Sequence, residues 1–396
     1  MLRAVLFSVL IVCVITKEED YRTVVLDVGA VIGEKYWKGD FFEFYGIPYA
    51  TAPKGRDRFK APLPVEPWEG IRKADILNIV CEQIYLVEDE TEEPILDGVE
   101  DCLILNMLVP EIANENNLLP VMVYIHSGAY AGGSSNMAKM HYLARHDVIV
   151  VSFNYRIGAI GFNLAISIGY NDTGNIKDLN EFLLNAPIKD LAEKSKNFFL
   201  TNSTFGLAPC IQSADVTEPI LTESPLDILK RGDYKRIPVL TGYSNMEGIS
   251  RTIKFGKWRE LMNEDFTEFL PADLAFDNDN SRDDFIKSIK KNYFNNEEVS
   301  ASSLQEYVDY FSDAMFKYGI MKSAKLHATK SPVYLYEFMY VGKLNMKHHY
   351  MDRLKGASHR DQTAYILDFY EYTTKPKDFD TRDRLTAMWT DFVKYE

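Results

Sequence analysis

The segment DVIVVSFNY, Asp147 to Tyr155, decides the fold class of this 396-residue chain. Its central part, VIVVSF, places apolar side chains at consecutive positions, so both faces of an extended strand would be apolar. This pattern is typical of a strand inside a sheet that helices cover on both sides. The segment therefore predicts a central strand of an α/β sheet.

Strand-like and helix-like segments alternate along the rest of the chain. Further strands are expected in VVLDVGAVIG (24–33), CLILNMLVP (102–110), PVMVYIH (120–126), IPVLTGY (237–243) and PVYLYEFMYV (332–341). Apolar residues recur three and four positions apart in 283–294, 303–328 and 383–394, as in amphipathic helices. The alternation predicts an α/β protein, in which the polar, Asn- and Asp-rich stretch 257–300 is the loosest part.

The N-terminal residues predict a secreted protein. Residues 1–16, MLRAVLFSVLIVCVIT, carry one early arginine and an apolar run too short to cross a bilayer, and the charged KEED follows at once. This arrangement is typical of a signal peptide. Residues 17–396 are then expected to form one extracellular domain without a transmembrane segment, and 46% hydrophobic residues suffice for its core.

The net charge, one acidic run and two neighbouring histidines argue against nucleic acids, anionic membranes and metal ions as partners. A net charge of −14 repels phosphate backbones and anionic membranes, so nucleic acid is not expected to bind. The acidic run EDETEE (88–93) fits a solvated loop better than a cation site. The side chains of the neighbours His348 and His349 would point in different directions, so no metal site and no cofactor are predicted. The oligomeric state is not indicated.

Cysteines and glycosylation sequons agree with secretion. Without Cys13 of the signal segment, Cys81, Cys102 and Cys210 remain, which allows one disulfide and one free thiol. Asn171 in NDT and Asn202 in NST are acceptor sequons for N-glycosylation.

Three local motifs suggest catalysis. YIHSGAYAGGSS, Tyr124 to Ser135, follows a strand with small residues whose N–H groups can line an oxyanion hole, although an ordinary glycine-rich turn looks the same. Glu247 in TGYSNMEGIS follows a strand, as catalytic carboxylates of α/β enzymes do, and a polar turn residue is the alternative. His359 in GASHRDQ is a candidate general base or a solvated loop histidine.

Taken together, these motifs resemble the type-B carboxylesterases, the cholinesterase-like branch of the α/β-hydrolases. The ordered blocks that carry the resemblance are FYGIPYATAPKGRDRFKAP, PWEG, the unit Cys81-Glu-Gln83, EDCLILNMLVP, HSGAY, DVIVVSFNYRIGAIGF, TGYSNMEG and GASHRDQ. They extend over about 23–174 and from about 179 to the end. The resemblance implies an α/β-hydrolase fold, with a mostly parallel central sheet and helices on both faces.

The resemblance also assigns roles to residues. It implies that His359 is the general base and Glu247 the acid that orients it. Gly128 and Ala129 match the two oxyanion-hole donors, and Ala129 suits this role if its φ is negative. A disulfide between Cys81 and Cys102 is implied as well, worth about 3 kcal/mol.

The nucleophile is missing from this pattern. No Gly-x-Ser-x-Gly occurs in the chain, so the strand-turn-helix that presents the serine has no counterpart. The resemblance places the gap near 175–179, where GNIKD passes directly into LNEFLLN, and implies that the fold is incomplete and the C-terminus short. We therefore expect a family built for small carboxylic esters, but a chain that is inactive as written. The alternatives are a non-catalytic secreted protein that binds an apolar ligand, and a splice or gene-model fragment.

Overall fold

A computed structural model describes most of the chain in two compact units. The described residues are 20–57, 60–85, 95–137, 139–158, 169–171, 173, 175–187, 190, 200–204, 211–212, 219–348, 350, 352–368, 373 and 375–396. The predicted signal peptide, the acidic run 88–93 and Cys210 lie outside them. Unit 1 comprises Met1–Phe198, Leu367–Phe369 and Thr386–Tyr395, and unit 2 comprises Phe199–Ile366, Tyr370–Leu385 and Glu396. The single domain expected over 17–396 stays a prediction.

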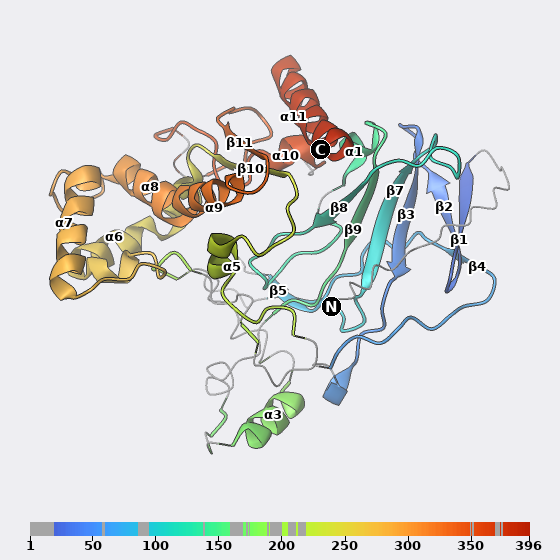
Figure 1. The fold of residues 1–396 in the computed structure, drawn as a ribbon, viewed down its shortest axis with the longest axis horizontal. Helices are drawn as coiled ribbons and strands as arrows, with labels where there is room; N and C mark the ends of the chain where they lie inside the picture. Colours follow the sequence, from blue (N-terminus) through green and yellow to red (C-terminus); the bar gives the residue numbers. More distant parts are fainter. Residues whose placement is uncertain are drawn as a thin grey trace. The chain divides into compact units, whose positions relative to one another are not determined.

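Unit 1 contains a seven-stranded sheet, coloured blue to green in Figure 1. The strand order is β1-β2-β3-β7-β9-β8, and β4 pairs with β2. The strands are β1 (Tyr21–Leu26), β2 (Gly29–Lys35), β3 (Phe41–Pro48), β4 (Ile71–Lys73), β7 (Ile104–Pro110), β8 (Val121–Ile125) and β9 (Ile149–Phe153). The expected strand is present and interior, because β9 lies between β7 and β8; only Val150 and Ser152 of it are fully buried, so coverage of both its faces stays a prediction.

The pairing corrects the expectation of a mostly parallel sheet. The pairs β1–β2, β2–β3, β3–β7 and β7–β9 are antiparallel, and only β2–β4 and β8–β9 are parallel among the described pairs of this sheet. The segment 24–33 is not one strand, because the chain turns at Asp27 and Val28 between β1 and β2. Such a short connection can only join antiparallel strands.

Shorter elements complete the described part of unit 1. They are the 3-10 turn η1 (Gly55–Asp57), the two-stranded sheet of β5 (Gln83–Tyr85) and β6 (Ile95–Asp97), α1 (His141–Ala144) and α3 (Ile176–Asn185). Asn175 caps α3, since its side-chain oxygen accepts a hydrogen bond from Lys177 N at 3.0 Å. The residues of the predicted gap therefore form the first turn of a helix.

Unit 2 combines helices with a two-stranded parallel sheet of β10 (Val239–Ser244) and β11 (Val333–Phe338). Its elements around the buried cluster are η2 (Glu247–Lys254), α6 (Phe255–Glu264), η3 (Phe266–Phe269), α7 (Asp279–Phe294) and α8 (Leu304–Ser312), seen in yellow and orange in Figure 1. The others are α5 (Pro225–Arg231), α9 (Tyr318–Ala328) and α10 (Thr363–Ile366). Helix α11 (Pro376–Tyr395) contributes residues to both units.

The stretch 257–300 is well packed, so the expectation that it is the loosest part is wrong. Trp258, Met262 and Phe269 belong to the main hydrophobic cluster of unit 2. A capping box at Asn278 starts α7, because Asn278 and Ser281 each bond to the other's main chain. The polar residues that suggested a loose segment therefore occupy caps and exposed faces.

The helical stretch 303–328 is not one regular helix. Between α8 and α9 it forms a π-helical turn, η4, at Asp313–Lys317. None of the helices in the described ranges is long and apolar enough to cross a membrane.

Candidate active site

The structure brings two of the predicted site residues together in unit 2. The Nδ1 of His359 donates a hydrogen bond to Oε2 of Glu247 at 2.7 Å. The carboxylate is buried, whereas 38% of the histidine side chain is exposed. Because the carboxylate fixes the proton on Nδ1, Nε2 is the nitrogen left to accept a proton. This is the arrangement of an oriented general base, and the catalytic roles of both residues stay predictions.

Glu247 is held by the end of β10 and by α8. Its Oε1 accepts a hydrogen bond from Ser244 N at 2.7 Å. The next residue, Gly248, donates from its N–H to the Ser312 hydroxyl at 2.8 Å. A Cβ at Gly248 would lie 2.2 Å from the Val308 carbonyl oxygen, so only glycine lets the chain approach α8 this closely. The glycine that follows the acid is therefore required by packing.

The loop that carries His359 is fixed by a buried carboxylate. Asp361 accepts hydrogen bonds from Ser358 N at 2.6 Å and from Met346 N at 2.7 Å. Burial raises the pKa of Asp361, although these donors and Asn345 oppose that shift. Ala357 N also donates to the Asn245 side chain at 2.8 Å, which ties the loop to the end of β10.

A buried arginine and an aromatic ring lie beside the pair. Burial lowers the pKa of Arg251 to about 10, against the attraction of Tyr307 and Glu247, so the guanidinium keeps its charge at neutral pH. Its Nε donates to the sulfur of Met315 at 3.0 Å. The ring of Phe316 lies 4.8 Å from the imidazole of His359. Both contacts come from the π-helical turn.

The predicted oxyanion loop lies in unit 1 and forms a tight turn. Gly128 has φ 134°, and its carbonyl oxygen accepts hydrogen bonds from Ala131 N and Gly132 N. A Cβ at Gly128 would lie 1.8 Å from the Gly132 carbonyl oxygen. Within the described structure, the N–H groups of Gly128 and Ala129 donate no hydrogen bond, so both are available to a ligand oxygen.

The backbone of Ala129 does not have the negative φ that would suit a donor in the oxyanion hole. Its φ is 51° and that of Tyr130 is 61°, so both residues adopt the left-handed conformation that disfavours residues with a Cβ. The condition of a negative φ at Ala129 is therefore not met, and the reason is the closed turn that begins at Gly128. Its role as a donor stays a prediction.

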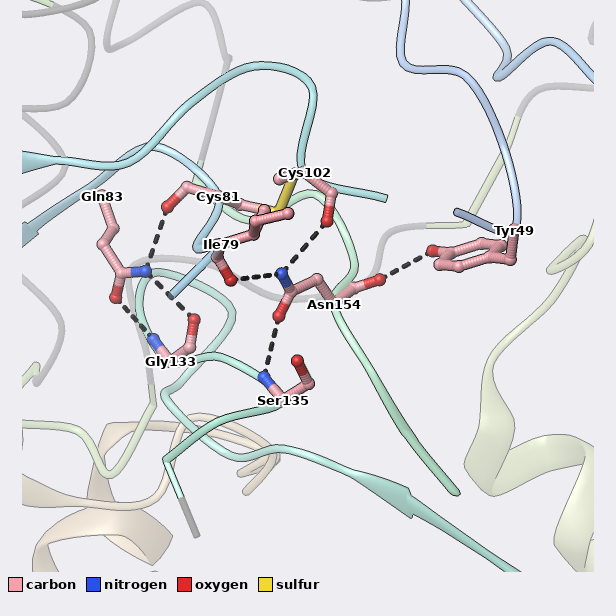
Figure 2. The surroundings of a disulfide bond; sticks show 8 residues. All are labelled: Tyr49, Ile79, Cys81, Gln83, Cys102, Gly133, Ser135 and Asn154. Atoms are coloured by element: carbon pink, nitrogen blue, oxygen red, sulfur yellow. Dashed lines mark hydrogen bonds between the residues drawn. A yellow bond between two sulfur atoms is a disulfide. The ribbon is translucent and has the colours of Figure 1, made fainter. Parts of the chain in front are cut away.

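The predicted disulfide between Cys81 and Cys102 is present, and Figure 2 shows how its surroundings support the oxyanion loop. Gln83 Nε2 donates to the carbonyl oxygens of Cys81 and Gly133, and Gln83 Oε1 accepts from Gly133 N at 2.7 Å. The disulfide segment thus holds the middle of the loop through one glutamine side chain.

Asn154, which follows β9, holds the end of the same loop. Its Oδ1 accepts from Ser135 N at 2.8 Å, and its Nδ2 donates to the carbonyl oxygens of Ile79 and Cys102 (Figure 2). Tyr49 donates to the Asn154 carbonyl oxygen at 2.7 Å. Every polar group of this fully buried amide therefore has a partner.

Sequence reasoning did not find Gln83, Asn154 and Asp361 as supporting residues. Each lies within a block that carries the family resemblance, CEQ, SFNYR or SHRDQ. A polar residue within such a block was the available signal, but it does not indicate distant partners such as Gly133 for Gln83, Ile79 for Asn154 and Met346 for Asp361.

Other predicted sites can be placed only in part. Asn171 is exposed, and Asn202 is half-buried with its side-chain oxygen accepting from the Thr204 hydroxyl at 2.6 Å. Of the two neighbouring histidines, His348 is described and His349 is not. No group of three or more His, Cys, Asp or Glu residues in the described ranges could hold a metal ion.

A mixed sheet in unit 1 together with the helices of both units is consistent with the fold of an α/β-hydrolase. A solved structure supports this class: juvenile hormone esterase from Manduca sexta, with OTFP covalently attached, matches with a TM-score of 0.79 at 22% identity, over 95% of this chain and 90% of that chain. The chain belongs to the Carboxylesterase family, whose sequence model matches residues 20–167 and 163–396. The resemblance stated from the motifs is thereby confirmed.

Similar proteins include insect esterases. Esterase E4 of Myzus persicae is 27% identical over 457 residues, which cover 89% of this chain and 82% of the relative. Juvenile hormone esterase of Tribolium castaneum is 25% identical over 492 residues, which cover 93% of this chain and 82% of the relative. Membership of this family supports hydrolysis of carboxylic esters as the family's general chemistry.

Proposed function

We propose that this chain is a secreted member of the Carboxylesterase family that has lost ester hydrolysis because it lacks the nucleophile. The observation that carries the proposal is that the Glu247–His359 pair is formed at 2.7 Å while no Gly-x-Ser-x-Gly exists in the sequence. An oriented base without a nucleophile performs no acyl transfer. Removing the serine of subtilisin costs about 10⁶ in turnover, or roughly 8 kcal/mol of transition-state stabilisation.

Neighbouring serines are poor substitutes for the missing one. The Ser244 hydroxyl donates its proton to the side-chain oxygen of Gln362 at 2.9 Å, so it is not donated to His359 as a nucleophile requires. Ser358 is fully buried, so a substrate cannot reach its hydroxyl. Both observations favour an inactive chain over one with a displaced nucleophile.

The comparisons are consistent with an internal gap. The family model matches in two segments that meet at 163–167, a few residues before the predicted gap at 175–179. The alignment with Esterase E4 extends over 457 residues, more than the 396 of the whole chain, so the relative has internal residues without a counterpart here. A missing strand-turn-helix would account for both facts.

A serine-hydrolase probe tests the loss of activity. The chain, secreted from a eukaryotic host, is treated with a fluorophosphonate probe and assayed with p-nitrophenyl butyrate, beside Esterase E4 as the positive control. We expect no labelling, and hydrolysis no faster than that of the His359→Ala variant. Labelling that His359→Ala abolishes would show that another residue serves as the nucleophile.

Two alternatives to an inactive esterase, a non-catalytic binding protein and a gene-model or splice fragment, can be distinguished by experiment. A non-catalytic binding protein would retain an apolar ligand, which native mass spectrometry of the secreted chain would detect. A gene-model or splice fragment would be recognised in protein from the natural source. In protein from that source, a peptide that contains Asn175 to Asn180 as they stand in this sequence supports the chain as written. If the only peptides from this region are longer ones that contain a Gly-x-Ser-x-Gly, the chain as written is contradicted.

Secretion rests on the predicted signal peptide, the two sequons and the disulfide of unit 1, since disulfides persist in oxidising compartments. We expect the chain to appear in the culture medium without residues 1–16. Peptide-N-glycosidase treatment should lower its mass, and the shift should become smaller in Asn171→Gln and Asn202→Gln. Retention of the chain inside the cell with an intact N-terminus would contradict secretion.

A further inference from the structure

Unit 2 contains a pocket of about 240 Å³ near the loop that carries His359. Its lining residues lie within 249–361, so the pocket is formed by unit 2 alone. Neither Glu247 nor His359 is among the described lining residues, which separates the pocket from the candidate active site. The apolar and aromatic side chains that line it are those of Ile249, Val341, Met346, Tyr350 and Leu354.

Part of the pocket wall belongs to the hydrophobic core of unit 2. Ile249 and Leu354 are 4% and 6% exposed and are members of the main hydrophobic cluster. Tyr350 packs against the same cluster, and its ring lies 6.3 Å from that of Phe255. Side chains packed in a core hold fixed positions, so the shape of this wall is set within unit 2.

The two buried polar side chains at the pocket already bond to protein groups. Asn345 donates from Nδ2 to Asp361 Oδ2 at 2.8 Å and to the Tyr340 carbonyl oxygen at 3.0 Å. Its Oδ1 accepts from Gly342 N and from the Tyr365 hydroxyl. The carboxylate of Asp361 also accepts the two main-chain bonds that fix the His359 loop. A polar ligand would therefore lose its water without gaining these groups as partners.

Two basic residues also line the pocket, and neither requires an anionic ligand. Lys355 is exposed, so its ammonium group can stay in water while its methylene groups line the pocket. His348 attracts Asp361 and so opposes the rise in the pKa of that carboxyl that burial causes. The charge of His348 is thereby compensated within the wall itself.

We propose that this pocket binds a small, neutral, apolar molecule. An apolar cavity of about 150 Å³ holds benzene, so a pocket of about 240 Å³ has room for roughly ten carbon atoms, as in naphthalene. The flexible side chain of Met346 can adapt to the shape of such a ligand. The proposal does not depend on whether the chain hydrolyses esters, because the pocket uses neither residue of the Glu247–His359 pair.

Calorimetric titration of the secreted chain with naphthalene tests the binding. We expect saturable binding to the wild type and an affinity about tenfold lower in Val341→Trp, because the larger side chain occupies part of the pocket. Ile237→Trp is the matched control and should bind like the wild type. Ile237 is 52% exposed, Val341 is 53% exposed, and Ile237 does not line the pocket. Circular dichroism checks that both variants are folded.

Methyl NMR of the methionines locates the ligand without a change to the pocket. The ring current of bound naphthalene should shift the methyl signal of Met346, which the loss of one signal in Met346→Leu identifies. Met339 is 61% exposed and does not line the pocket, so its signal should stay unchanged. This readout remains informative even if Val341→Trp fails to fold.

Charged analogues test the chemistry of the ligand. Naphthoate and naphthylmethylammonium should each bind about tenfold more weakly than naphthalene, since a charge would lose its hydration in the pocket. Four results would overturn the proposal. They are no saturable binding of naphthalene, an unchanged affinity in folded Val341→Trp, a Met346 signal that naphthalene does not shift, and a charged analogue that binds as tightly as naphthalene.

Discussion

Glu247 and His359 form a 2.7 Å hydrogen bond although they are 112 residues apart, and each is fixed by its own loop before the two meet. Ser244 N orients the carboxylate, and Asp361 fixes the loop of the imidazole through Ser358 N. The pair is therefore part of the packing of unit 2, whatever its catalytic use.

Removing this pair should destabilise the protein even if the chain has no activity to lose. We expect His359→Ala to lower the free energy of unfolding by about 1–2 kcal/mol, because the buried carboxylate of Glu247 loses a hydrogen-bond donor. The loss stays moderate because the histidine is partly exposed to water. Urea denaturation of His359→Ala, Glu247→Gln and the double variant gives the coupling energy. A coupling near zero would mean that the two side chains contribute independently.

Asn154→Ala should be among the costliest single changes in unit 1. Asn154 is fully buried, and its amide serves Ser135 N and the carbonyl oxygens of Ile79 and Cys102. Leaving these groups unpaired should cost about 3 kcal/mol. Asn114→Ala, in an exposed turn, is the control and should change the free energy of unfolding by no more than about 0.5 kcal/mol. Equal effects of the two variants would refute this account.

Loss of the disulfide should have a comparable effect. Cys81 and Cys102 are 21 residues apart, and opening a loop of this size costs about 3 kcal/mol on the chain-entropy estimate. We expect Cys81→Ala/Cys102→Ala to show this loss in urea denaturation, and reduction of the wild type to reproduce it. Cys210→Ala, which leaves the disulfide intact, should retain the stability of the wild type.

The stability of unit 1 should depend on pH through His141. This buried residue has Nε2 2.8 Å from Glu43 Oε1 and Nδ1 3.8 Å from Asp368 Oδ2. Burial alone lowers the pKa of His141, but the attraction of Asp368 and Glu43 outweighs it, so the pKa is raised above 6.5. A raised pKa contributes stability that is complete below pH 6.5 and is lost as the pH rises through the folded-state pKa.

We therefore expect the free energy of unfolding to fall as the pH rises from 6.5, by at most about 1.4 kcal/mol per pH unit from this one proton. His141→Asn should remove that component of the slope. Urea denaturation of both proteins at several pH values on each side of 6.5 measures it. The same slope in both proteins would assign the pH dependence to other groups.

The sequence predicted the fold class and the paired residues because both depend on local blocks. VIVVSF indicated the interior strand, and the order of the motifs indicated Glu247 and His359. What failed depends on tight turns that an apolar pattern does not reveal, and on side-chain contacts distant in sequence. The turn at Asp27 divides an apolar run that reads as one strand, and the positive φ of Ala129 follows from a turn closed at Gly128. Gln83 and Asn154 bond to main-chain groups, which leave no pattern in a sequence.

The π-helical turn between α8 and α9 has a consequence for insertions and deletions. A π turn holds one residue more than a regular turn, and one residue rotates a helix by about 100°. Deleting a residue from Asp313–Lys317 could restore a regular helix without rotating α9, but it would change which side chains face inward there. The extra residue of the π turn thus determines that Phe316 contacts His359 and that Met315 contacts Arg251. The number of residues in this turn, as well as their type, decides which ring lies against the imidazole.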